Sequence, residues 1–265
     1  MSFTTGGVPR KFDVNCSILF TDLPLLERAA AAKAAGFDAV EFWWPFGEDA
    51  TPGDKEIDAF VRSIDDAGVQ LVGLNFIDLI PAGRGLVSVP GAETKFRDNV
   101  PVAVGIAERL GCKALNALYG NRIEGESPEQ QDELALENLR FAAKAAQGID
   151  AIVLLEALNA IESPAYPVVS SAHAVRIIEQ VGEPNVRFLC DLYHLARMDE
   201  NLTSVIENYG RWFGHVQIAD SPNRGRPGSG ELDFAQLFGA LDAIGYDGYI
   251  GLEYKDPELD WEWIK

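Results

Sequence analysis

The fold is most evident in residues 151–158, AIVLLEAL, and residues 186–194, VRFLCDLYH, two short apolar runs with the length and composition of buried strands. Six similar runs occur elsewhere, and longer stretches rich in alanine and charge, typical of helices, separate them. The other predicted strands are FDVNCSIL (12–19), AVEFWW (39–44), VQLVGLNF (69–76), KALNALYG (113–120), HVQIAD (215–220) and YIGLEYK (249–255). Eight strand–helix units, spaced by roughly thirty residues, predict a parallel (β/α)8 TIM barrel of the α/β class, in a single domain over residues 1–265.

The predicted helices support the same alternation. The clearest are LPLLERAAAAKAAG (23–36), KEIDAFVRSIDDAG (55–68), TKFRDNVPVAVGIAERLG (94–111) and PEQQDELALENLRFAAKAAQ (128–147). Several helices end at a glycine, which accepts the left-handed conformation of a helix cap. We expect such caps at Gly36, Gly68, Gly111, Gly148, Gly182 and Gly245. No GxGxxG motif links a strand to a helix and no GxxxxGKS/T motif occurs, so we expect no organic cofactor.

The charge balance excludes some classes of function. The chain has 22 Lys and Arg against 41 Asp and Glu, a net charge of −19, and such an acidic surface repels the phosphates of a nucleic acid. Three cysteines without CxxC spacing argue against a disulfide framework or a thiolate zinc site. With no apolar N-terminal core and no run long enough to span a bilayer, we expect a cytoplasmic, reduced protein with no membrane partner.

Two long loops are expected to cover the strand ends as binding lids. The loop IDLIPAGRGLVSVPGAE (77–93) follows the third strand and holds Arg84. The loop SPNRGRPGSGELDF (221–234) follows the seventh strand and holds Arg224 and Arg226. Cations are scarce in this chain, which favours binding loops over plain surface excursions.

Each of the last four predicted strands carries one polar side chain after a buried apolar run. These side chains are Glu156, Asp191, Gln217 and Glu253. The carboxyl ends of the strands carry the chemistry of a TIM barrel, so the four should converge. A buried carboxylate stays ionised only when it is paired or binds a cation, and no lysine or arginine of these strands is expected to reach them. Because all four donors are oxygens, the pattern predicts Mg²⁺ or Mn²⁺, with about two coordination positions left for a substrate.

Three stretches carry a resemblance to a known family: LLEALN (154–159), CDLYHLARMDENL (190–202) and HVQIADSPNRGRPGSGELDF (215–234). The chain resembles, nearly end to end, the hydroxypyruvate isomerase family, a branch of the xylose-isomerase-like TIM barrels that includes 2-oxo-tetronate isomerases. The resemblance implies that Glu156 and Glu253 are the catalytic pair. It also implies that Asp191 and Gln217 complete the metal site. Related ketose 3-epimerases carry histidine at the position of Gln217, which favours the isomerase branch.

Two departures from the family pattern leave the substrate open. The loop LNFIDLIPAGRG (74–85) lacks a glycine–aspartate pair that is often seen before the arginine–glycine step of the isomerases. The stretch EFWWPF (41–46) contains Trp43 and Trp44, where smaller or less aromatic residues are expected. Both tryptophans are interpreted as either pocket wall or core.

Four residues are predicted to contact the substrate. The resemblance places His194 on the substrate side, where it binds a substrate oxygen or orients a ligand, and assigns Glu162 to a substrate hydroxyl. A guanidinium grips a carboxylate with two hydrogen bonds, so Arg224 is the first candidate to hold a substrate carboxylate. Arg84 is the second candidate.

The carboxylate pair and the resemblance together predict an aldose–ketose isomerisation through an enediolate. A divalent cation polarises the carbonyl, one glutamate removes the adjacent C–H proton, and the pair returns a proton to the neighbouring carbon. Hydroxypyruvate would become tartronate semialdehyde, and either glutamate can act first. The alternatives are a 2-oxo-tetronate isomerase, a ketose 3-epimerase-like sugar isomerase on the same scaffold, and a barrel that binds a sugar acid without turnover. An apurinic-site endonuclease needs a histidine-rich zinc cluster, and three histidines argue against it.

Two further features have two interpretations each. His215 shares a strand face with Gln217, so it either flanks the site or is a buried histidine with its hydrogen bonds satisfied. The C-terminal stretch DPELDWEWIK (256–265) carries Trp261 and Trp263. These indoles pack either on the barrel or on a partner subunit, which leaves a homo-oligomer open.

Overall fold

The computed structural model describes residues 10–80 and 83–264. Eight of the described strands run parallel and close into a barrel in the order of the chain. They are β1 (Phe12–Asn15), β2 (Ala39–Phe42), β3 (Gln70–Asn75), β6 (Ala114–Asn116), β7 (Ile152–Glu156), β8 (Val186–Asp191), β9 (Phe213–Ile218) and β10 (Ile250–Leu252). The predicted (β/α)8 barrel is confirmed.

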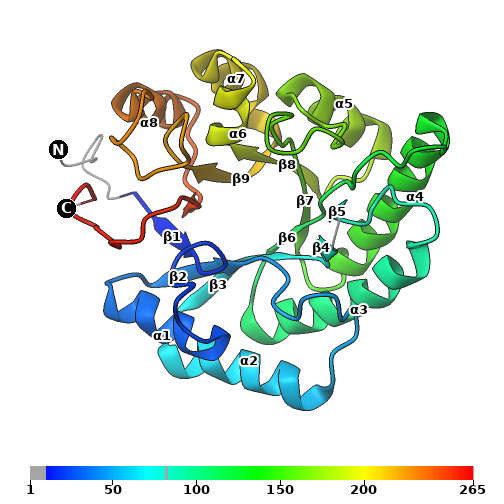
Figure 1. Ribbon diagram of the computed structural model, residues 1–265, viewed down its shortest axis with the longest axis horizontal. Coiled ribbons are helices and arrows are strands. Elements are labelled where there is room, and N and C mark those ends of the chain that lie inside the picture. The colour runs from blue at the N-terminus through cyan, green and yellow to red at the C-terminus, as the bar shows by residue number, and fades with distance from the viewer. Residues whose placement is uncertain (1–9, 81–82, 265) are drawn as a thin grey trace.

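Helices alternate with the strands and form a ring outside the barrel (Figure 1). They are α1 (Leu25–Ala34), α2 (Asp54–Ala67), α3 (Glu93–Leu110), α4 (Pro128–Gln147), α5 (Ser171–Val181), α7 (Leu202–Tyr209) and α8 (Phe234–Ala243). Shorter elements are the antiparallel pair β4 (Leu79–Ile80) and β5 (Gly83–Arg84), the helix α6 (Leu192–Arg197) and the 3-10 turn η1 (Gly210–Trp212). The helices of the described part are too short or too polar to cross a membrane.

Most of the predicted glycine caps are confirmed. Gly36, Gly68, Gly111, Gly182 and Gly245 all have positive φ angles. The prediction is wrong at Gly148, which follows α4 in a right-handed conformation with φ −59°. There the left-handed residue is Asp150, with φ 56°, so the chain turns two residues later than expected.

The predicted strand over residues 186–194 is too long. It ends at Asp191, and α6 begins at Leu192. The reason is a helix cap: one carboxylate oxygen of Asp191 accepts hydrogen bonds from the backbone N–H groups of Tyr193 (2.8 Å) and His194 (3.4 Å). The same side chain that was predicted to bind a metal therefore also turns the chain into a helix.

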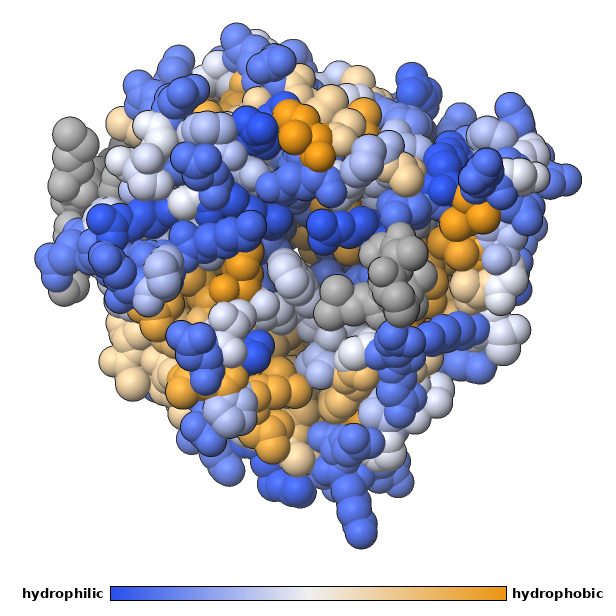
Figure 2. Space-filling model, viewed as in Figure 1, coloured by the Kyte–Doolittle hydropathy of each residue, from blue (hydrophilic) through white to orange (hydrophobic). Residues whose placement is uncertain are grey.

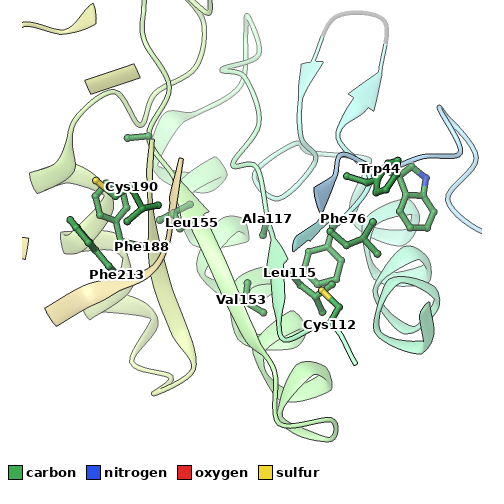
Figure 3. Close-up of a cluster of buried hydrophobic side chains, with 14 of the residues drawn as sticks. Trp44, Phe76, Cys112, Leu115, Ala117, Val153, Leu155, Phe188, Cys190 and Phe213 are labelled. Carbon is green, nitrogen blue, oxygen red and sulfur yellow. The ribbon is translucent and has the colours of Figure 1, made fainter. Parts of the chain in front are cut away.

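The main apolar core lies between the barrel strands and the surrounding helices. Figure 3 shows part of it, where β6, β7 and β8 contribute side chains that alternate with the inward-facing ones. Phe188 and Phe213 are buried there, and a fully buried side chain of this size stabilises the fold by about 1.5–3 kcal/mol. Trp44 is 1% exposed in this core, and its indole donates a hydrogen bond to the carbonyl of Asp49 (2.8 Å).

The inside of the barrel is lined unevenly. Near β6, β7 and β8 it holds a small apolar cluster of Ala114, Leu154 and Leu189. Near β1, β2 and β9 it is polar, with Asp13, Glu41 and His215 all buried. Gly251 of β10 leaves room for the polar side, because a Cβ atom there would lie 2.9 Å from Glu41 Oε1. The interior of the barrel is therefore filled partly by polar contacts and partly by apolar packing.

Candidate functional site

The carboxyl ends of β7 and β8 and the residue after β10 bring three acidic side chains together. Glu156, Asp191 and Glu253 are 5%, 2% and 4% exposed, and we refer to them as the carboxylate cluster. His194, from the first turn of α6, joins them, and one potential ligand atom of each residue lies within 4.8 Å of the others. A cavity lined by Glu156, His194, Arg224 and Glu253, among others, borders the cluster. Figure 2 shows the surface hollowed near the centre of this face, beside hydrophilic residues.

Burial changes the protonation of the carboxylate cluster. It raises the pKa of Glu156 well above the usual range, and the charges of Glu253 and Asp191 raise that pKa further. Burial likewise raises the pKa of Glu253, and it raises the pKa of Asp191 to about 8 although Arg224 opposes the shift. The cluster therefore takes up protons near neutral pH unless a cation balances its negative charges.

A cation already reaches the cluster from the loop after β9. The guanidinium of Arg224 forms a short ion pair with Glu253 and lies 3.8 Å from Asp191 Oδ2 and 3.9 Å from Glu162 Oε2. No lysine or arginine of the four strands was expected to pair with these carboxylates. The cation that does pair with them, Arg224, comes from the loop instead. Arg224 is 8% exposed and has a φ of 56°, a left-handed conformation that costs about 1–3 kcal/mol for a non-glycine residue. The loop thus holds a strained backbone in order to place this side chain.

Neutral donors also contact the two glutamates, and they do so unequally. Glu253 Oε1 accepts hydrogen bonds from Trp43 Nε1 (2.6 Å) and Asn15 Nδ2 (3.0 Å). Glu156 Oε2 accepts one from Asn116 Nδ2 (2.9 Å). Together with Arg224, Glu253 therefore has more donors that stabilise its ionised form than Glu156 has.

His194 points one N–H group, that of Nε2, towards the carboxylate cluster. Its Nδ1 accepts a hydrogen bond from the backbone N–H of Asn159 (3.1 Å), and the side-chain amide of Asn159 lies 2.7 Å from the same nitrogen. Burial lowers the pKa of His194 well below its usual range, and Arg224 lowers it further, so the ring is neutral and its proton is on Nε2. Nε2 lies 3.5 Å from Asp191 Oδ2 and 3.9 Å from Glu156 Oε1. The ring therefore presents an N–H group to whatever occupies the cavity.

Gln217 lies beside the cluster but deeper in the barrel. Its Cα pairs in register with Asp191, and its Nε2 donates a hydrogen bond to Glu41 Oε1 (2.7 Å). Its Oε1 is buried without a hydrogen-bond partner, and so is Oδ2 of Asp191. Two unsatisfied buried acceptors in neighbouring residues are costly unless a cation or a donor binds them.

The mouth of the cavity carries the remaining predicted substrate residues. Arg84 is exposed and lines the opening together with Glu162, Arg224 and Lys255. Burial alone would raise the pKa of Glu162, but hydrogen bonds from Tyr193 Oη (2.7 Å) and Asn159 Nδ2 (3.1 Å) hold that pKa below its usual value. The structure thus brings all eight predicted site residues to one end of the barrel.

The structure also decides between the two interpretations that the sequence left for each of the tryptophans and for His215. Trp43 is pocket wall, whereas Trp44 is core. His215 is a buried histidine in the barrel interior: burial would lower its pKa, but its hydrogen bond to Glu41 (2.8 Å) raises the pKa to about 9. Trp261 and Trp263 pack on the barrel's own aromatic rings, which are Phe12, Phe20, Phe37 and Tyr254.

Sequence reasoning missed the amides and the acid on the other side of the barrel. Asn15, Asn75 and Asn116 end β1, β3 and β6, and Glu41 is the third residue of β2. All four are buried polar residues late in a strand, so the criterion applied to the last four strands would have found them in the first four. The amides of Asn15 and Asn116 donate to the glutamates Glu41, Glu253 and Glu156. The amide of Asn75 instead donates to Asp78 (2.5 Å).

The family follows from comparison with known proteins. Residues 29–264 match the model of the family described as "Xylose isomerase-like TIM barrel". The chain belongs to this family. A Streptomyces coelicolor relative, provisionally named hydroxypyruvate isomerase, is 54% identical over 98% of this chain and 97% of its own length. The Escherichia coli protein named hydroxypyruvate isomerase is 35% identical over 92% of this chain and 93% of its own length.

Two other relatives bear different names. The 2-oxo-tetronate isomerase of Haemophilus influenzae is 32% identical to this chain, over 95% of this chain and 97% of its own length. A Brucella melitensis crystal structure, named AP endonuclease, family 2, superposes with a TM-score of 0.84 and 37% identity, covering 94% of each chain. The fold and the family are therefore shared across proteins with more than one name.

Proposed function

We propose that this chain is a metal-dependent isomerase that converts a small hydroxy-keto acid, in the first place hydroxypyruvate, into its aldose–ketose isomer. The observation that carries the proposal is the pair of buried glutamates, Glu156 and Glu253, that borders one cavity and has raised pKa values. A buried carboxyl whose pKa is raised above its usual value is suited to take up and release a proton in turn. The names of the relatives support the same class of reaction.

The residues of the site fit a divalent cation. Glu156, Asp191 and Glu253 offer carboxylate oxygens close together, and Gln217 would add the buried amide oxygen that lacks a hydrogen bond, a donor set that suits Mg²⁺ or Mn²⁺. The buried oxygens of Asp191 and Gln217 that lack a hydrogen bond, Oδ2 and Oε1, support a ligand at this place. When bound, such an ion supplies Lewis-acid polarisation of the substrate carbonyl and stabilises the negative charge that develops on it.

The two glutamates would divide the proton transfer unequally. Glu253, which its three donors help to keep ionised, would take the proton from the hydroxyl-bearing carbon. Glu156, whose raised pKa lets it hold a proton more readily, would deliver a proton to the former carbonyl carbon. The hydroxyl proton moves between the two substrate oxygens, so that hydroxypyruvate becomes tartronate semialdehyde, and the proton gained by Glu253 must replace the one lost by Glu156 before the next turnover.

The other side chains would bind and orient the substrate. The N–H of His194 donates to a substrate oxygen, because its Nδ1 is already an acceptor. Arg84 and Arg224 are the arginines that border the cavity, and they hold the substrate carboxylate. Glu162, whose pKa is lowered, is ionised at the mouth and accepts from a substrate hydroxyl.

A 2-oxo-tetronate isomerase is the second candidate, favoured by the relative of that name. Its chemistry would use the same residues on a substrate one carbon longer. A sugar-acid binder without turnover would not need two glutamates with raised pKa values. The name of the Brucella structure refers to an endonuclease, but a net charge of −19 opposes binding of this chain to a nucleic acid.

A substrate panel tests the proposal. Purified protein with Mg²⁺ or Mn²⁺ is assayed for isomerisation of hydroxypyruvate, 2-oxo-tetronate and a ketohexose, beside Glu253→Gln. The proposal expects the highest kcat/KM on hydroxypyruvate and a turnover at least about 10²-fold lower in the variant, whereas a higher kcat/KM on 2-oxo-tetronate would favour the second candidate. Preference for the ketohexose would replace the proposal with the sugar-isomerase alternative. No turnover of any of the three by metal-bound protein would leave a binding protein.

A further inference from the structure

A buried hydrogen-bond network lies beneath the carboxylate cluster, and the proton chemistry does not use it. Its centre is Glu41, which projects from β2 into the barrel and is 3% exposed. Its carboxylate accepts hydrogen bonds from Asn15 Nδ2 (3.0 Å), Gln217 Nε2 (2.7 Å) and His215 Nε2 (2.8 Å). A buried acid that is ringed by three donors is held in one orientation, so its two oxygens have separate partners.

The division of partners is specific. Oε2 of Glu41 contacts His215, and Oε1 is left to the amides of Asn15 and Gln217. Two glycines leave space for this arrangement. A Cβ atom at Gly73 would lie 3.2 Å from Glu41 Oε2, and one at Gly251 would lie 2.9 Å from Oε1.

The consequence concerns the amide of Gln217. A side-chain amide has one donor end and one acceptor end, and only the oxygen binds a hard cation. Because Nε2 donates to Glu41, Oε1 of Gln217 faces away from Glu41, where it is buried and has no hydrogen-bond partner. In the reversed orientation two oxygens, one of them anionic, would face each other at hydrogen-bond distance, which is repulsive.

We propose that Glu41 is a positioning residue that fixes the amide of Gln217 with its oxygen presented to the metal of the carboxylate cluster. The inference rests on the proposed function, because it requires that cluster to bind a divalent ion. His215 supports Glu41 from the opposite oxygen, so the two residues form a buried base under one ligand of the site. Outer partners of this kind typically contribute 10–100-fold to metal affinity.

A double-mutant cycle on the full chain tests the proposal. The dissociation constant for Mn²⁺ is measured by calorimetry at one pH for the wild type, Glu41→Gln, Gln217→Ala and the double variant. Glu41→Gln should weaken Mn²⁺ binding about 10–100-fold, because the new amide places an N–H group among the three donors and lets the amide of Gln217 turn. In the Gln217→Ala background the same change should have an effect of less than about twofold, because the oriented amide is gone.

The cycle separates positioning from charge. Losing a negative charge near the metal weakens binding by the same factor in both backgrounds, so equal effects would overturn the proposal. So would a Glu41→Gln variant that binds Mn²⁺ as the wild type does. Wild-type protein that fails to bind Mn²⁺ at all would overturn the proposed metal site itself, whereas a wild type that binds and turns over substrate but shows no coupling would overturn only the role of Glu41.

A second measurement does not depend on the folding of a Glu41 variant. The side-chain NH2 signal of Gln217 is identified in wild-type protein by its absence from Gln217→Ala. It should be protected from solvent exchange, because Nε2 is bonded to Glu41, and it should shift on addition of Mg²⁺, because a cation at Oε1 polarises the amide. An NH2 signal that ignores saturating Mg²⁺ would overturn the proposal.

Discussion

Arg224 is predicted to stabilise the metal-free protein by balancing the carboxylate cluster. Its guanidinium pairs with Glu253, lies 3.8 Å from Asp191 Oδ2 and is almost fully buried. Removing one partner of a buried ion pair typically costs about 3–5 kcal/mol, so Arg224→Gln should lower the free energy of unfolding by that amount at pH 8. The loss should be smaller at pH 5.5, because Asp191, whose pKa is raised to about 8, then takes up a proton and needs the cation less.

Urea unfolding of the metal-free protein in EDTA, at both pH values, measures this loss. Arg226→Gln is the matched control, since it removes the same side chain from the same loop. Arg226 pairs with Asp260 (2.6 Å) but is 36% exposed, and a surface pair contributes only about 0–1 kcal/mol. A loss below about 1 kcal/mol for Arg224→Gln at pH 8 would equal that of a surface pair and refute the reasoning. An equal loss at the two pH values would refute it too.

Three further outcomes are expected. Glu156→Gln and Glu253→Gln should each lower kcat about 10²–10⁴-fold at saturating metal, the usual effect of losing a proton-transferring group, and a loss below tenfold in steady-state assays would contradict the assigned role. The free energy of unfolding of the metal-free protein should fall as the pH rises from about 4 to about 8. The reason is that folding raises the pKa of Asp191 to about 8, so the folded chain binds more protons than the unfolded one in this range. Urea unfolding should show a weaker pH dependence in Asp191→Asn, and an unchanged one would count against this explanation. Gly251→Ala should destabilise the fold by about 1–3 kcal/mol, because its Cβ would crowd Glu41, and an unchanged thermal midpoint would show that the interior can relax.

The barrel could be predicted from sequence because its evidence is local. Apolar runs the length of a strand alternate with helical stretches along the whole chain, and each pair can be recognised without its neighbours. The errors occur at the ends of two elements. Asp191 looked like a residue inside a strand, but its carboxylate caps α6, and Gly148 looked like a cap, but Asp150 takes the left-handed conformation.

The site could be predicted only in part, because two kinds of contact are not local. Glu156, Asp191, Gln217 and Glu253 follow from the position of strand ends in a barrel. The pairing of Arg224 with Glu253 depends on how the loop after β9 folds back, which no spacing in the sequence specifies. The positions of Trp43 and Trp44 could not be separated from sequence, because both lie after the end of β2 at Phe42, where the alternation of a strand no longer holds.

The most direct test of the central claim is the exchange of substrate protons with deuterated solvent, followed by NMR on hydroxypyruvate with Mg²⁺ or Mn²⁺. If the buried glutamate pair forms an enediolate, solvent deuterium enters the substrate as product forms. Exchange should require the metal, and it should vanish in Glu253→Gln and in Glu156→Gln. Metal-bound wild-type protein that leaves every substrate proton in place, or exchange that survives in both variants, would contradict the account.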